Sequence, residues 1–223
     1  MKRIKTTVLL LCLSVFSFTA CNNEPKGDEA SVTEEQAAAN ATGQTYAVDT
    51  AASYIRFTGN GVGKAHPGRF RLANGEVAIM NNQPTGGNFT INMYSLDMEE
   101  EGESIDKKLQ PHLLSDDFFG TEKYPTAKFE LTSIEPYKES ADNKSVVAGA
   151  NYMISGNLTL REQTKNVSFP AKVDVDANKV TAKADFDIDR RQWDITYGND
   201  KSLGDQFISE TVNIELRLEA NKQ

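Results

Sequence analysis

The sequence is poor in the residues that most often perform chemistry. Its 223 residues include two cysteines, two histidines and one tryptophan. A zinc site usually takes three or four His, Cys or carboxylate ligands, but His66 and His112 lie far apart and neither has a neighbouring ligand motif. No Gly-x-Ser-x-Gly sequence marks a nucleophile elbow. The residues therefore predict no metal, no cofactor, no catalytic residue and no enzymatic activity.

Positive charge is also scarce. The chain has 24 basic and 32 acidic side chains and a formal net charge of −8. Residues 1–20 carry three basic side chains and no acidic one, so the remainder has a net charge of −11. An acidic surface repels phosphate backbones, which excludes nucleic acid as an expected partner. The same charge gives no electrostatic attraction to anionic lipids.

The hydrophobic run near the N-terminus is too short to span a bilayer. It covers Val8–Phe18 and follows the basic residues Lys2, Arg3 and Lys5, whereas a spanning helix needs about 20 apolar residues. A basic start, a short apolar stretch and small residues before a cleavage site are typical of a secretory signal peptide. We therefore expect residues 1–20 to be removed, the alternatives being a retained anchor or a short buried helix.

Cys21 is the only cysteine that would remain, because Cys12 lies in the removed segment. A single cysteine in a secreted chain cannot form an internal disulfide. Phe18-Thr19-Ala20-Cys21 resembles a bacterial lipobox with Phe in place of the usual Leu, and acylation at Cys21 would anchor the chain to a membrane. This predicts a lipoprotein of the cell envelope that faces the periplasm, with the outer membrane favoured. The alternative is an ordinary secreted protein with a free thiol.

The residues after Cys21 contain little apolar surface. Residues 22–44 have one valine and no aromatic side chain, too little to offset the entropy of ordering. We interpret residues 21–44 as a lipidated cysteine with a flexible tether, and residues 45–223 as one domain.

Within that domain, apolar and polar residues mostly alternate, which is the period of a half-buried strand. Eight segments show the pattern: residues 54–58, 76–79, 89–94, 127–132, 152–160, 167–175, 182–188 and 212–219. Many one-faced strands separated by turns indicate a sandwich or a barrel. The fold class predicted is all-β, an extended antiparallel barrel of about eight strands. The last strand, Val212 to Leu218, could pair with the first strand or with a second copy in a homodimer.

Residues 103–119 break the alternation. Apolar residues recur at four-residue spacing from Ile105 to Leu113, and Ser104 is suited to cap a helix. Pro111 is expected to kink or end this helix, and Ser115 to begin a second short one. The pair Phe118-Phe119 has to be buried, so we expect a helical insertion across the mouth or side of the barrel.

Three ordered signatures resemble the YceI-like, polyisoprenoid-binding family. They are 112–120 with 124–129, Gly156 to Arg161 with Thr164-Lys165, and Phe186 to Arg190 with Trp193, Ile195, Tyr197 and Gly198. The resemblance runs from Thr45 to about Ala220, and Glu162 stands where the family usually has glycine. It implies a lipocalin-like barrel around an elongated apolar tunnel, with no shared catalytic residues.

The resemblance implies a non-enzymatic carrier of a long-chain apolar or amphiphilic ligand, such as an isoprenoid-type lipid or a quinone. The residues expected to line the tunnel are Phe57, Phe89, Ile91, Phe129, Leu131, Tyr152, Ile154, Leu158, Phe169, Phe186 and Trp193. Arg161 and Arg190 are candidate head-group ligands, with a structural ion pair as the alternative.

Several inward-facing positions hold small residues, which leave room for a ligand but also suit tight packing. These are Ala127, Gly156, Ala171, Ala182 and Ala184. A filled barrel that acts as an envelope interaction module therefore stays open, and so does an unrecognised hydrolase or isomerase.

Overall fold

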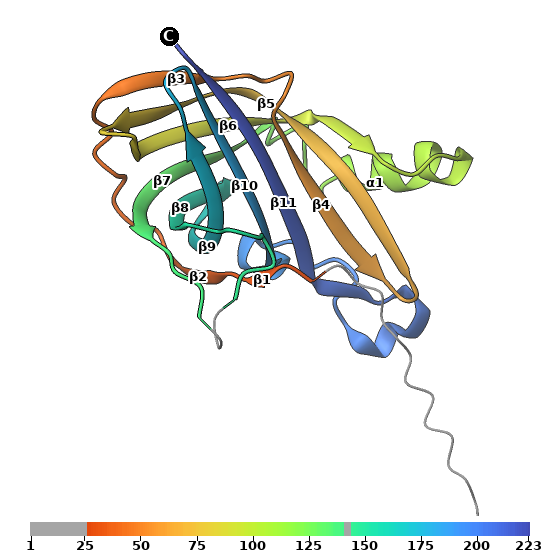
Figure 1. Cartoon of the computed structure of the whole chain (residues 1–223). Coiled ribbons are helices and arrows are strands. Elements are labelled where there is room, and N and C mark those ends of the chain that lie inside the picture. Colours follow the sequence, from red (N-terminus) through yellow and green to blue (C-terminus); the bar gives the residue numbers. More distant parts are fainter. Residues whose placement is uncertain (1–25, 141–143) are drawn as a thin grey trace, which may run out of the picture.

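The computed structural model describes residues 26–140 and 144–223, so the expected signal peptide (residues 1–20) and Cys21 lie outside the described residues. Eight long strands form a closed antiparallel barrel (Figure 1). They are β4 (Tyr54–Gly61), β5 (Lys64–Met80), β6 (Gln83–Met98), β7 (Thr126–Pro136), β8 (Tyr152–Leu160), β9 (Gln163–Val175), β10 (Lys179–Asp189) and β11 (Ile208–Lys222). The predicted all-β barrel of about eight strands is confirmed.

Apolar and polar residues alternate along the barrel strands, as the sequence indicated. Along β10, Phe186 and Ile188 face Ile214 and Val212 of β11, with the polar side chains between them on the outer surface. The last strand closes the barrel within the chain, because β11 pairs with β4 and with the short strand β3 (Gln44–Val48). Among the described residues, no helix is long and apolar enough to cross a membrane.

Residues 26–43, called the strap below, lie against the outside of the barrel. They contain the short strands β1 (Asp28–Glu29) and β2 (Ser31–Glu34). β9 and β10 pair with each other only between residues 172–175 and 180–183. Beyond that point β1 pairs with β10 and β2 with β9, so the strap bridges the two diverging strands.

The strap then crosses the outer wall toward β3. Gln36 and Asn157 exchange two hydrogen bonds, of 3.1 and 2.7 Å. The Ala39 N–H donates to the carbonyl of Leu131 at 2.8 Å, next to a bulge in the pairing of β7 with β8. The described part of the segment expected to be a flexible tether is therefore docked. Its composition did not show this, because main-chain bonds to strand edges depend little on side-chain type.

The strap meets a group of carboxylates on β10 and β11. Asn213 Nδ2 donates to Asp185 at 2.7 Å and to Asp187 at 2.9 Å, and the Gly27 N–H also donates to Asp187 at 3.1 Å. Burial raises the pKa of Asp185, whereas the hydrogen bond from Asn213 lowers it. The negative charges of nearby carboxylates, of which Glu215 has the largest effect, raise it further, and the net shift is upward. Ionisation of Asp185 is therefore less favourable in the folded protein than in the unfolded chain.

We expect Asp185→Asn to increase stability at neutral pH. The native pKa of Asp185 lies above its ordinary value of 3.8, so the native state binds more protons than the unfolded state between these two values, and stability falls as pH rises through them. The amide keeps an acceptor for Asn213 but carries no charge. Urea unfolding should show a higher midpoint for the variant at pH 7. That gain should shrink as pH is lowered toward 3.8, and a gain independent of pH would contradict the explanation.

The helical insertion between β6 and β7 is present, with three differences from the prediction. A π-helical turn (Ile105–Leu109) runs directly into α1 (Gln110–Leu114), so Pro111 lies in the first turn of α1, where its missing N–H is tolerated. Ser104 makes no side-chain cap. No second helix follows Ser115, whose hydroxyl donates to the His112 carbonyl at 2.7 Å within a turn.

Two 3-10 helices follow β10: η2 (Arg190–Trp193) and η3 (Lys201–Gln206). Asp189 accepts a hydrogen bond from the Arg191 N–H and Asp200 accepts one from the Ser202 N–H, the second residues of η2 and η3, as N-caps do. The loops around η2 and η3, the β4–β5 hairpin and the helical insertion lie at the same end of the barrel (Figure 1). We call this the loop end.

Candidate functional site

The loop end of the barrel encloses a cavity of about 410 Å³, a volume within the range of small-molecule sites. Its walls are almost entirely apolar and come from the barrel strands, the helical insertion and the segment 205–209. The opposite end is filled by the buried side chains of Leu131, Ile154, Val173, Val180 and Leu218. The barrel is therefore hollow at one end and packed at the other.

A row of four phenylalanines forms part of the cavity wall on the side of the packed end. The ring centroids of Phe89 and Phe129 are 6.2 Å apart, those of Phe129 and Phe169 are 6.0 Å apart, and those of Phe169 and Phe186 are 3.9 Å apart and nearly parallel. Gly156 makes room for this row, because a Cβ there would lie 2.2 Å from Cζ of Phe129.

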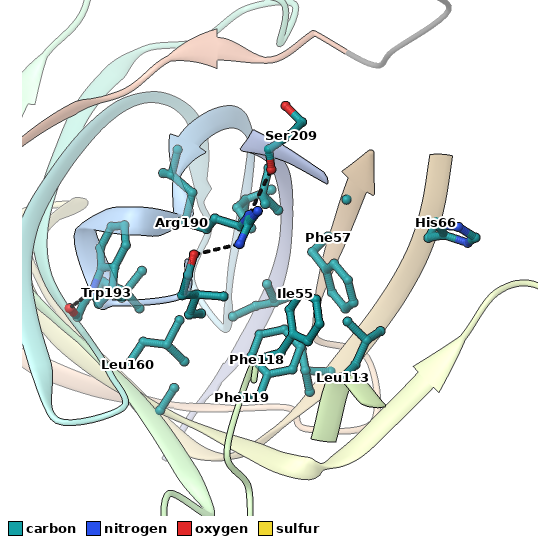
Figure 2. Close-up of a pocket in the computed structure, with 18 of the residues that line it drawn as sticks. Ile55, Phe57, His66, Leu113, Phe118, Phe119, Leu160, Arg190, Trp193 and Ser209 are labelled. Atoms are coloured by element: carbon teal, nitrogen blue, oxygen red, sulfur yellow. Dashed lines mark hydrogen bonds between the residues drawn. The ribbon is translucent and has the colours of Figure 1, made fainter. Parts of the chain in front are cut away.

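The helical insertion forms another part of the wall. Phe119 meets the rings of Phe57 and Phe70 edge-on, at 5.7 and 5.2 Å between centroids. Phe118 packs against His112 at 5.0 Å and Tyr197 at 5.4 Å. Figure 2 shows Phe118, Phe119 and Leu113 grouped at one side of the cavity. The pair Phe118-Phe119 is thus buried by the insertion, as expected from the sequence.

Arg190 fastens the loops at this end. Its side chain is 5% exposed and lines the cavity. It donates to four main-chain carbonyls, those of Ser209, Ile195, Tyr197 and Ile208, at 2.7–3.0 Å (Figure 2 shows two of these bonds). Burial lowers the pKa of Arg190. The guanidinium therefore holds the segment after η2 and the start of β11 together beside the cavity.

Trp193 and Arg161 complete the loop end. Trp193 is fully buried, and its Nε1–H donates to the Leu158 carbonyl at 3.0 Å. Arg161 donates to the carbonyls of Phe118 at 2.9 Å and Asp194 at 3.3 Å, which links the helical insertion to the η2 loop. Arg161 does not line the cavity. Arg161 and Glu162 form the β8–β9 turn with φ of 53° and 64°, a conformation that glycine adopts more easily.

Eight residues expected to line a tunnel do line the cavity, and three do not. The eight are Phe57, Phe89, Ile91, Phe129, Leu158, Phe169, Phe186 and Trp193. Leu131, Tyr152 and Ile154 lie instead in the core at the packed end or against it. Their inward orientation follows from alternation, but their distance from the cavity depends on where the barrel is packed.

The sequence analysis missed several lining residues on elements it had not extended far enough. Phe70 and Leu72 line the cavity from β5, which begins at Lys64, whereas the expected strand began near residue 76. Their alternation with Arg69 and Arg71 was a usable signal. Phe207, in the loop before β11, and Ile208, the first residue of β11, also line it, at positions where no periodicity indicates burial.

The two histidines each contact one carboxylate. His66 Nδ1 lies 2.6 Å from Glu100, which also pairs with Lys64 at 3.5 Å. His112 Nε2 lies 2.8 Å from Asp117. Burial acts to raise the pKa of the Glu100 carboxyl, but the hydrogen bond and charge interaction with His66 outweigh it, so this pKa is lowered. Across the described ranges, no group of three or more potential ligands could hold a metal ion.

Residues 46–220 match the YceI-like domain family. The chain belongs to this family. A UPF0312 protein of Photorhabdus laumondii is 40% identical over 86 residues, covering 39% of this chain and 36% of that protein. A UPF0312 protein of Pseudomonas aeruginosa is 31% identical over 106 residues, covering 48% of each. The matches thus span half or less of these relatives.

Solved structures show the same barrel as this YceI-like chain. BcnA of Burkholderia cenocepacia superposes with a TM-score of 0.61 at 20% identity, covering 78% of this chain and 99% of that one. A polyisoprenoid binding domain of Saccharophagus degradans, described as implicated in plant cell wall breakdown, has a TM-score of 0.58 at 16% identity, covering 81% and 99%. At such identities the likeness establishes the fold alone.

Proposed function

We propose that this YceI-like protein binds and carries a long-chain apolar or amphiphilic molecule, a polyisoprenoid-type lipid or a quinone, without catalysing a reaction. The observation that carries the proposal is the cavity of about 410 Å³ with apolar walls. Buried water needs two to four polar partners, and the phenylalanine row offers none. An apolar chain suits this space, and each Å² it buries contributes about 25 cal/mol.

The polar groups of the cavity gather at the loop end, which gives the ligand a direction. Arg190, His66 and Asn60 line the cavity there, together with Asp205 and Gln206. The apolar tail would lie against the phenylalanine row and the polar head near these groups. Most of the N–H donors of Arg190 already bond to main-chain carbonyls. Arg190 would therefore attract the head group mainly through its charge rather than through a bidentate contact.

The proposed setting is the bacterial cell envelope. A signal peptide over residues 1–20 and an acylated Cys21 would place the barrel on the periplasmic side of a membrane, with the outer membrane favoured. The support comes from the basic and apolar N-terminal pattern and from the position of the cysteine. The polyisoprenoid-binding description of the Saccharophagus neighbour supports the ligand class.

Mass spectrometry of organic extracts tests the binding function. The protein should be the mature chain from residue 21 with Cys21→Ser, purified from a bacterial envelope fraction without an acyl anchor. We expect a long-chain species at near one molecule per chain. A ligand-free protein that ignores added farnesol and polyprenyl phosphate would overturn the proposal and favour an envelope interaction module.

A further inference from the structure

The strap determines where the chain leaves the barrel toward its N-terminus. Gly27 lies against Phe186 and Asn213, so closely that a Cβ at residue 27 would be 2.5 Å from the Phe186 Cα and 2.7 Å from the Asn213 amide. Phe186 lines the cavity, and Asn213 directly follows Val212, which also lines it. The first described residues therefore lie on the outer wall at the level of the cavity.

The loop end presents exposed apolar side chains around the cavity. Val62, in the turn of the β4–β5 hairpin, is 57% exposed, and Leu203 in η3 is 42% exposed. The hairpin and the η3 region are joined, because Gly61 pairs with Ile208. Figure 1 shows the tip of β4 and β5 beside the blue loop that contains η3. We call Val62 and Leu203 the rim.

The rim lies within reach of Cys21. Asn213, which Gly27 contacts, pairs with Thr58 of β4, so Gly27 lies at the level of Thr58. Val62 is four residues further on, in the turn after β4, which at about 3.3 Å per residue is a distance of roughly 13 Å. Six residues separate Cys21 from Gly27, and a chain of this length spans at most about 20 Å. An acyl anchor on Cys21 can therefore reach the level of Val62 while the strap stays docked.

The charges near the rim specify the kind of membrane. Lys64 pairs with Glu100 at 3.5 Å, and Lys201 lies between Asp200 and Asp205 in the sequence. The net charge is −8 for the whole chain and −11 without residues 1–20. Such a surface has no preference for anionic lipid. Contact would depend on the apolar rim and on the anchor, and therefore suits a bilayer of uncharged or zwitterionic head groups.

We propose that the rim sits on a zwitterionic bilayer surface with the cavity facing it, and that the ligand passes between bilayer and cavity without crossing bulk water. This inference rests on the proposed function and adds the route of ligand entry. The docked strap makes it specific, because a flexible tether of 24 residues would have left the orientation of the barrel free.

The test uses the mature chain from residue 21 with its Cys21 thiol coupled to a maleimide phospholipid in phosphatidylcholine vesicles. Trp193, the only tryptophan, lines the cavity, so energy transfer from Trp193 to a dansyl-labelled farnesyl probe reports entry. We expect Val62→Asp with Leu203→Asp to slow loading from the bilayer at least 10-fold. The control pair, Met80→Asp with Tyr94→Asp, replaces exposed apolar residues elsewhere and should change the rate less than twofold.

A measurement without vesicles separates the two proposals. The same variants with Cys21 blocked are mixed with the probe in water, and energy transfer at saturation is recorded. Equal saturation in all variants together with slow loading only in the rim variant supports the inference. Equal saturation with equal loading rates overturns the inference and leaves the carrier function standing. No energy transfer in any variant overturns the proposed function itself.

Discussion

A Leu158→Asp substitution is expected to empty the cavity. Leu158 faces the cavity from β8, and a carboxylate there would have to be buried against the proposed apolar ligand or hold water in its place. Such a buried, unpaired charge costs several kcal/mol, and a loss of about 3 kcal/mol corresponds to more than a 100-fold weaker affinity. Mass spectrometry of extracts from the purified variant should show the co-purified lipid strongly depleted.

Matched variants show whether the loss comes from the cavity. Met153→Asp places the same charge on the face of β8 opposite to that of Leu158, away from the cavity. Leu216→Asp places it on the cavity wall formed by β11. We expect Leu216→Asp to lose the ligand and Met153→Asp to retain it. Arg161→Ala should have a smaller effect than Leu158→Asp, because Arg161 does not line the cavity. Retention of ligand by both cavity variants, with their circular dichroism unchanged, would contradict an apolar binding site.

Removal of the strap is expected to give the largest loss of stability. A chain beginning at residue 44 loses the pairing of β1 and β2 and the bonds to Asn157 and Leu131. At about 0.5–1.5 kcal/mol for each hydrogen bond, the free energy of unfolding should fall by roughly 4 kcal/mol or more. The exposed edges of β9 and β10 should also promote association of copies.

Urea unfolding and size-exclusion chromatography would measure both effects. The control is a chain beginning at Lys26, which keeps the strap and lacks only the preceding residues. We expect the control to unfold at the same urea midpoint as the chain from residue 21 and to stay monodisperse. If the chain from residue 44 matched it in both measurements, the strap would have no structural role, and its contacts with β9 and β10 would be incidental.

Much of the barrel could be predicted because its signal is local. In β10, alternating residues from Ala182 to Ile188 show which side chains face inward, and the same holds for Val212 to Leu218 in β11. The helical insertion was visible from the four-residue spacing of Ile105, Leu109 and Leu113. Each of these features depends on neighbouring residues in the chain.

The candidate site was predicted less completely, because facing inward differs from facing a cavity. Ile154 and Leu158 lie on the same face of β8, yet only Leu158 lines the cavity. What separates them is the phenylalanine row, whose members come from β6, β7, β9 and β10. Periodicity along one strand carries no information on where other strands place their large side chains.

By itself, therefore, the sequence determined an antiparallel barrel with a helical insertion and an apolar interior, and it indicated the family. Only the tertiary structure decided that the barrel is hollow at its loop end, that Arg190 binds main-chain carbonyls rather than a carboxylate, and that residues 26–43 are docked. The physical reason is that strand alternation is written in consecutive residues, whereas a cavity, a buried cation and a docked strap depend on contacts between residues far apart in the chain.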